Sequence, residues 1–207
     1  MGLNKLSKLK KTNNSFDKNK ELVDKMKKGF KIKLINNLSV GTVCHVCAVS
    51  RMEYNLENYK QELVLGFDEF NYLVNNKKKI LKNFDLMPVE CEINDYDNSE
   101  ENLLNKVLRV FGLANIYDID EENSGGSYLY EDVLDDIILK LKYKDFVEIV
   151  EEIPLALYEK VVMRAIELCR IGELSDMQRI NYFITSTDDP DLFMEEIKDN
   201  SKVRRIR

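Results

Sequence analysis

The spacing of hydrophobic residues changes near residue 94, and this change constrains the fold more than any other feature of the chain. Residues 31–35 alternate between charged and apolar side chains, which predicts a strand with one buried face. Residues 155–171 instead carry Leu157, Val161, Ala165 and Leu168 at helical spacing. The sequence therefore predicts an α+β protein, in which a small β-rich N-terminal unit is followed by an all-helical C-terminal unit.

The N-terminal unit, residues 31–93, predicts a β-β-β-α-β order. The strands are expected over residues 31–35, 42–50, 62–65 and 86–93, with a helix over residues 68–81. Pro88 cannot donate a hydrogen bond to a neighbouring strand, so the last strand is expected at an edge of the sheet.

The helical unit, residues 94–201, begins after a polar and acidic stretch where we place the domain boundary. Gly172 and the pair Ser175 and Asp176 are typical of a helix end followed by a new helix start. Helices are expected over residues 101–116, 130–141, 143–152, 155–171, 177–184 and 191–197.

Charge is distributed very unevenly along the chain. Residues 1–34 carry eleven lysines against three acidic residues, a net of +8, whereas residues 94–201 carry a net of −16. Residues 202–207 return to +4. We therefore distinguish a basic N-terminal arm, residues 1–30, and a basic C-terminal tail, residues 202–207, from the acidic helical domain.

The arm carries apolar residues between its lysines. Leu3, Leu6 and Leu9 recur at every third position, and Leu22 and Met26 share one side of a second helical stretch. Because so short an amphipathic segment is marginal alone, we expect it to order only against a partner.

Opposite charges on one chain favour contact with partners or with other copies, since complementary patches steer association. The simpler alternative is that the arm is a tail that docks on an acidic protein surface, and this chain carries such a surface itself. The residues expected to bind a partner are Lys5, Lys8, Lys10, Lys11, Lys25, Lys27, Lys28, Arg204 and Arg205.

Cys44 and Cys47 are spaced as in half of a tetrahedral zinc site. The other half is missing, because His45 is the only histidine and the flanking residues predict a strand. In a strand, residues three apart point to opposite faces. We therefore interpret the cysteines as small core residues.

An acidic loop at residues 120–131 resembles the calcium-binding loop of an EF-hand. Asp120, Glu122, Ser124 and Glu131 stand at ligand positions, and Gly125 stands where the turn requires glycine. Glu122 is longer than the usual ligand, and no second loop accompanies this one. The alternative is a surface loop between two helices, with no cofactor bound.

Catalytic motifs are weak throughout the sequence. With His45 as the only histidine, a serine or cysteine triad lacks a suitable base, and no glycine-rich phosphate loop is present. An enzyme with a small-molecule substrate is thus the class with least support.

Nucleic-acid binding is an alternative that the lysines of the arm would serve, since they neutralise phosphates without reading sequence. The segment around Gly172 loosely matches a helix-turn-helix, in which Gln178, Arg179 and Asn181 would be the base-reading residues. The acidic surroundings oppose the approach of DNA.

Location and class follow from composition. No apolar run approaches the roughly 18 residues that span a bilayer, and four scattered cysteines indicate reduced thiols. We expect a cytoplasmic or host-cytoplasmic protein with no membrane partner.

The abundance of Lys, Asn and Ile is typical of AT-rich bacterial viruses or their hosts. The leading hypothesis is a non-enzymatic structural or assembly protein, forming homo- or hetero-oligomers and for example part of a bacteriophage virion. A nucleic-acid-associated regulator and a calcium-binding module are the alternatives.

Overall fold

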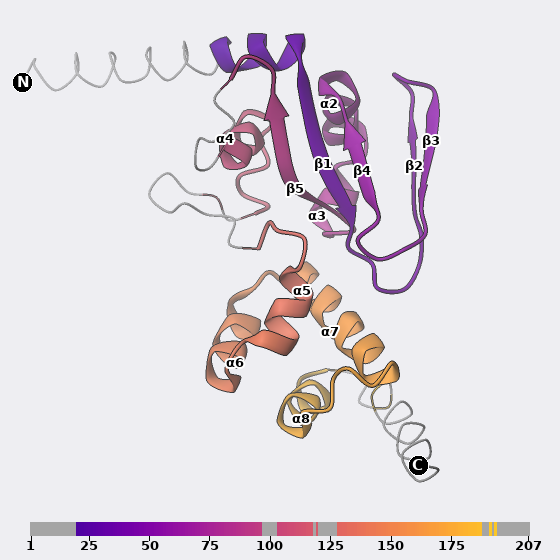
Figure 1. Cartoon of the computed structure of the whole chain (residues 1–207), viewed down its shortest axis with the longest axis vertical. Helices are drawn as coiled ribbons and strands as arrows, with labels where there is room; N and C mark the ends of the chain where they lie inside the picture. The colour runs from indigo at the N-terminus through magenta and orange to yellow at the C-terminus, as the bar shows by residue number, and fades with distance from the viewer. Residues whose placement is uncertain are drawn as a thin grey trace, which may run out of the picture.

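The computed structural model describes residues 20–96, 103–117, 119, 128–187, 191 and 193. Strands occupy the N-terminal half and helices the C-terminal half, so the α+β prediction is confirmed (Figure 1). A helix over residues 20–28 precedes the first strand. In chain order, the further elements are β1 (Phe30–Asn36), β2 (Val43–Cys47), β3 (Met52–Leu56), β4 (Glu62–Leu65), α2 (Phe67–Asn76), α3 (Lys78–Lys82), β5 (Leu86–Ile93), α4 (Leu103–Val110), α5 (Val133–Asp135), the π-helix η1 (Asp136–Lys140), α6 (Tyr143–Glu152), α7 (Leu155–Arg170) and α8 (Met177–Ser186).

A three-stranded antiparallel sheet has β1 at its centre, between β4 and β5. Ile32 of β1 lies opposite Leu65 of β4 and also opposite Cys91 of β5. β5 is therefore at an edge of the sheet, as the proline at position 88 predicted. Both β4 and β5 have the bounds that the sequence predicts.

Over its first residues, Phe30 to Lys33, β1 buries one face and exposes the other, whereas Leu34 to Asn36 are all buried. On the buried face, the Phe30 ring lies 6.3 Å from that of Phe70 in α2 and 6.2 Å from that of Phe111, which follows α4. On the other face, the Lys33 ammonium lies 2.9 Å from the Glu90 carboxylate of β5. This division explains the alternation that predicted the strand.

The β2–β3 hairpin differs from the single strand predicted over residues 42–50. The chain turns after Cys47, with Arg51 at a positive φ of 57°, and returns as β3. β3 lacks β-branched residues, so its own sequence gives little strand signal. It forms because it pairs with β2, where Tyr54 lies opposite His45 and the two rings stack 6.1 Å apart.

The helices predicted over 143–152, 155–171 and 177–184 are present with nearly the predicted bounds, and the others differ. α6 has the predicted bounds and α7 ends one residue earlier, whereas α4 is shorter than predicted. The helix predicted over 68–81 divides at Lys77, and the one over 130–141 becomes α5 followed by η1. The helix predicted over 191–197 falls mainly outside the described residues.

The turn between α7 and α8 follows the predicted capping. Gly172 has a φ of 81°, the left-handed conformation that glycine adopts freely after a helix. The Asp176 carboxylate accepts a hydrogen bond from the backbone N–H of Gln178 at 2.9 Å and so caps α8.

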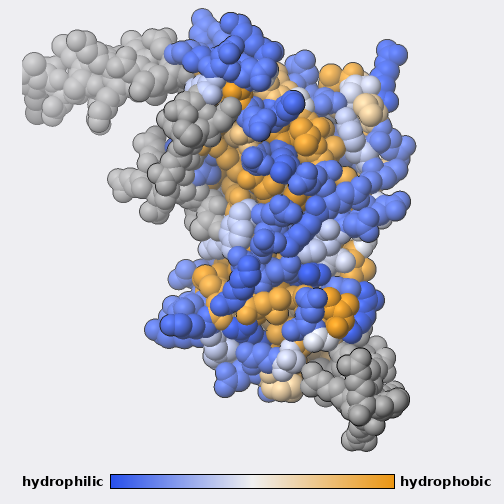
Figure 2. All heavy atoms as spheres, in the orientation of Figure 1, coloured by the Kyte–Doolittle hydropathy of each residue, from blue (hydrophilic) through white to orange (hydrophobic). Residues whose placement is uncertain are grey.

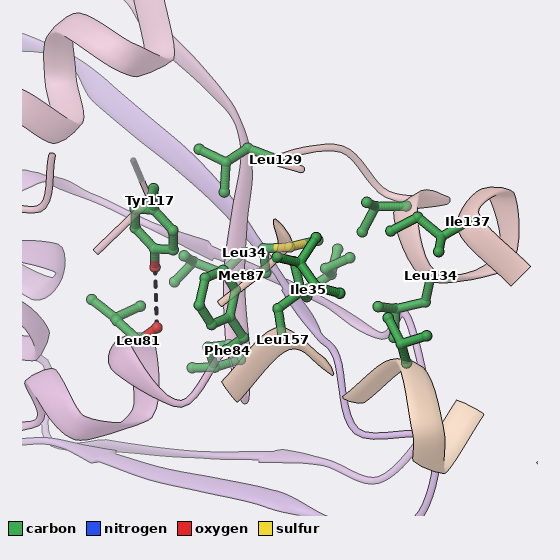
Figure 3. Packing of buried hydrophobic residues seen from close by; sticks show 14 of the residues in the cluster. Leu34, Ile35, Leu81, Phe84, Met87, Tyr117, Leu129, Leu134, Ile137 and Leu157 are labelled. Atoms are coloured by element: carbon green, nitrogen blue, oxygen red, sulfur yellow. Dashed lines mark hydrogen bonds between the residues drawn. The ribbon is translucent and has the colours of Figure 1, made fainter. Parts of the chain in front are cut away.

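One cluster of buried hydrophobic residues extends through both halves of the chain. Figure 3 shows Ile35 of β1 and Met87 of β5 packed near Leu157 of α7, where the sheet meets the helices. Beside them, the buried Tyr117 hydroxyl donates to the backbone carbonyl of Leu81 at 3.4 Å. The sheet half and the helical half therefore share a core.

The helix of residues 20–28 packs into this same core. Leu22 and Met26 are buried among the residues of the cluster. This part of the predicted arm thus buries its apolar side against its own chain and needs no second molecule for that purpose.

Candidate interaction surface

The basic end of the molecule is the outward side of the helix of residues 20–28. Lys20, Lys27 and Lys28 are exposed there. Lys25 is half-buried, where its ammonium pairs with Glu21 at 3.0 Å and lies 5.2 Å from the centre of the Tyr96 ring. Figure 1 places this helix at one end of the longest axis, and Figure 2 shows a hydrophilic surface over it. The other predicted partner-binding residues, Lys5, Lys8, Lys10, Lys11, Arg204 and Arg205, lie outside the described residues.

The acidic end of the molecule is formed largely by α6. Asp145, Glu148, Glu151 and Glu152 are all exposed on this helix. Among the described residues, only Glu148 of these four has an ion-pair partner, Lys144 at 3.4 Å. α6 lies in the helical half, well separated from the helix of residues 20–28 along the longest axis, and α8 lies further out than α6 (Figure 1). The exposed lysines of residues 20–28 and the acidic residues of α6 are therefore separated in space.

An ion-pair network fixes the two halves against each other. Asp135 of α5 accepts from the Arg164 Nε of α7 at 2.6 Å and from the Lys60 Nζ of the sheet half at 2.7 Å. Arg164 also lies over the Tyr59 ring, 4.3 Å from its centre. Burial alone would lower the pKa of Lys60, but its hydrogen bonds to Asp132 and Asp135 raise it above the usual value. The network holds the basic and acidic ends at a fixed separation.

An apolar groove lies where the two halves meet. It has a volume of about 490 Å³ and is formed by the loop after β1, one side of α7 and the end of α8. Its walls include Val40, Leu155 and Met163, which are 57%, 72% and 40% exposed. On the face drawn in Figure 2, hydrophobic residues reach the surface in both halves between hydrophilic ones. Contiguous exposed apolar side chains of this kind mark binding surfaces in soluble proteins.

Two hydroxyl groups of the groove lining lack hydrogen bonds. The Oγ of Ser39 and the Oγ1 of Thr187 are buried and have no partner within the described part of the chain. In contrast, Lys160 at the same groove is neutralised by Asp85, whose carboxylate lies 2.5 Å from its ammonium. The groove surface thus offers apolar contacts and little positive charge.

The two cysteines spaced like a zinc half-site do not converge. Cys44 is exposed on β2 and Cys47 is buried, because residues three apart on a strand point to opposite faces. In the described residues, no three His, Cys, Asp or Glu side chains gather as metal ligands. The interpretation as core residues fits Cys47, which is buried, and is wrong for Cys44, which is exposed. The Cys44 thiol donates to Glu53 at 3.4 Å, and this hydrogen bond raises its pKa.

His45 lies buried between the hairpin and α2. Neither ring nitrogen has a hydrogen-bond partner among the described residues. Burial lowers the pKa of His45, and the nearby Lys77 lowers it further, while Glu69 acts in the opposite direction. The Glu69 carboxylate is engaged by the Tyr54 hydroxyl at 2.9 Å. The arrangement holds a neutral, packed imidazole.

The predicted calcium loop is described only at its end. Asp120, Glu122 and Ser124 fall outside the described residues, and Glu131 is exposed just before α5. The calcium site therefore stays a prediction.

The base-reading role considered for Arg179 is wrong. Its side chain is 8% exposed and donates to the carbonyl of Ile138 at 2.5 Å and to that of Leu141. These carbonyls lie where η1 ends, so Arg179 supplies donors to backbone groups that the π-helix leaves unpaired. Gln178 and Asn181 are exposed.

Sequence reasoning missed the groove and the ion-pair network. Both are formed by residues far apart in sequence, such as Val40 with Met163 and Lys60 with Asp135. The sequence contains one signal for the groove. Leu155 is an apolar residue at the start of the predicted helix over 155–171, yet it is not among the residues that the helical spacing places on the buried side.

Comparison with protein-family models, curated proteins and solved structures finds no significant match to this chain. Within the described ranges, no helix is long and apolar enough to cross a membrane.

Proposed function

We propose that this chain is a non-enzymatic assembly protein that packs against other subunits through its basic N-terminal part and its acidic helical surface. A component of a bacteriophage particle, made in the host cytoplasm, is an example of such a protein. The observation that supports the proposal most is the separation of two oppositely charged surfaces, on the helix of residues 20–28 and on α6, along the longest axis of one body.

Opposite charges at opposite ends favour contacts in which the basic end of one copy meets the acidic end of the next. Such an interface is heterologous, because the two surfaces in contact differ, and repetition of it produces rings or filaments. Single exposed ion pairs contribute only about 0.2–1 kcal/mol each, so several must act together, and salt must weaken them.

The oligomeric state of the full chain at low and high salt tests this proposal. In size-exclusion chromatography with light scattering, we expect species larger than a monomer at low salt and dissociation as salt rises. A chain that is monomeric in both buffers would overturn the proposal.

Matched charge reversals identify the surface. Lys27→Glu combined with Lys28→Glu is expected to weaken association, since both lysines are exposed at the basic end. Lys79→Glu combined with Lys82→Glu changes the net charge equally but alters exposed lysines of α3, and should leave association unchanged. If both pairs of substitutions act alike, net charge rather than this surface governs association.

Addition of DNA or RNA before the same chromatography tests the nucleic-acid-binding alternative, because an arm that binds nucleic acid would form a larger, salt-sensitive complex.

A further inference from the structure

The groove at the junction of the two halves has an apolar wall along one side of α7, on which a second helix can pack. Leu155, Tyr158, Val162 and Met163 line it from α7, and their spacing places them in one stripe along that helix. Over this stripe α7 rises about 12 Å, at about 1.5 Å per residue. A stripe of this kind can bind an amphipathic helix, whose apolar residues, spaced one turn apart, pack into the groove.

We propose that this groove receives the leucine side of residues 3–11 from the N-terminus of a neighbouring copy. This inference rests on the proposed assembly function and names its contact. In a helix, Leu3, Leu6 and Leu9 would share one side and extend over about 9 Å. The three leucines would therefore fit within the length of the stripe on α7.

Charge on the two partners is complementary. Residues 3–11 carry four lysines and no acidic residue. Glu159 lines the groove and is exposed, and Glu151 and Glu152 end α6 just before Leu155. The one lysine of the groove lining is paired with Asp85 and so does not repel the segment. The segment can place its leucines on α7 and its lysines towards these carboxylates.

The shape of the groove favours a polypeptide over a small molecule. Small ligands occupy sites that bury most of their surface, whereas Leu155 here is 72% exposed and Val40 is 57% exposed. An extended, open apolar surface is instead what a docked helix covers.

Transfer between copies follows from the position of the two parts. The leucine segment precedes the helix of residues 20–28 at the basic end, and the groove borders the acidic helical half. When the basic end of one copy meets the acidic half of the next, the segment is delivered to the neighbour's groove.

Photo-cross-linking of the full chain tests this inference. The photoreactive residue p-benzoylphenylalanine replaces Leu6, and equal amounts of nitrogen-14 and nitrogen-15 protein are mixed at low salt before irradiation. We expect adducts between position 6 and the peptide that contains residues 155–163, with mixed isotopes that show a link between copies. The same probe in place of Val64, which is 50% exposed on β4, should give no such adduct.

Leu155→Asp provides a second readout. Because Leu155 is largely exposed, the substitution should leave the fold intact, which circular dichroism checks. It should raise the apparent dissociation constant about tenfold or more, the ratio expected when burial of one leucine is lost. Val64→Asp is the matched control and should leave the constant unchanged.

The outcomes separate this inference from the assembly proposal. If the chain associates in a salt-dependent manner but no adduct reaches residues 155–163, the groove assignment is wrong and the assembly proposal stands. Adducts found only within single copies would also overturn it. If the chain is monomeric at all salt concentrations, the assembly proposal itself fails.

Discussion

Asn36 ties the end of β1 to the hairpin, and its replacement should destabilise the protein strongly. Its side chain is fully buried, and its Nδ2 donates to the carbonyls of Leu56 at 3.0 Å and Asn58 at 3.1 Å. Its Oδ1 accepts from the backbone N–H of Leu38 at 3.0 Å. Asn36→Ala removes all three hydrogen bonds and leaves three backbone groups without this partner.

The expected loss follows from these contacts. At about 1 kcal/mol for each hydrogen bond, Asn36→Ala should lower the free energy of unfolding by about 3 kcal/mol. For a chain of this size, that loss lowers the melting temperature by about 6–12 °C. Urea unfolding followed by circular dichroism measures the first quantity, and a thermal scan measures the second.

Two further variants test whether the loss comes from the hydrogen bonds of Asn36. Asn36→Asp keeps the acceptor for Leu38 but loses both donated hydrogen bonds and buries a carboxylate against the carbonyl oxygens of Leu56 and Asn58. Because burial of an uncompensated charge is costly, Asn36→Asp should be no more stable than Asn36→Ala. Asn55→Ala alters an exposed asparagine of β3 and should change the free energy of unfolding by less than about 0.5 kcal/mol. An Asn36→Ala protein as stable as the wild type would refute the structural role assigned to this residue.

Three more predictions concern the junction, the buried histidine and the exposed thiol. Asp135→Asn leaves Arg164 and Lys60 without their shared carboxylate. The free energy of unfolding, measured by urea titration, should therefore fall by about 2 kcal/mol. His45 has a folded pKa below its ordinary value of 6.5, so the unfolded chain binds the proton more readily. Stability should therefore be fully present above about pH 6.5 and decline as the pH falls below it. His45→Phe should reduce that decline in urea titrations between about pH 5 and 7, and an unchanged pH profile would contradict the burial of a neutral imidazole. Cys44 is the exposed thiol of the described residues, so Cys44→Ser should remove the fastest phase of thiol labelling under native conditions, and persistence of that phase would place the reactive thiol elsewhere.

The sequence predicted those elements whose own residues carry the pattern. The alternation in β1 and the helical spacing in α6 and α7 arise from side chains that each element buries for itself. Pro88 predicted an edge strand because a missing N–H has the same consequence in any sheet.

What the sequence could not predict depends on partners elsewhere in the chain. β3 forms because β2 offers it a neighbour, and η1 ends where Arg179 of α8 binds its carbonyls. The helix predicted over 68–81 divides at Lys77, whose φ of −133° departs from helical values. These outcomes follow from tertiary contacts that no local pattern encodes.

The candidate surface was predictable in charge but not in shape. The lysines of the arm and the acidic residues of α6 are evident in the sequence, and the structure adds that the lysines of residues 20–28 lie far from α6 along the longest axis. The groove required the loop after β1, α7 and the end of α8 to meet, which only the fold reveals.

A complementation experiment tests head-to-tail packing most directly. One variant carries Lys27→Glu and Lys28→Glu, which reverses two charges on the helix of residues 20–28, and the other carries Glu151→Lys and Glu152→Lys, which reverses two charges on α6. By sedimentation velocity at low salt, we predict that each variant alone stays monomeric and that an equimolar mixture associates, since the reversed charges of one variant then face those of the other. A mixture that remains as dissociated as its components would contradict assembly through these two surfaces.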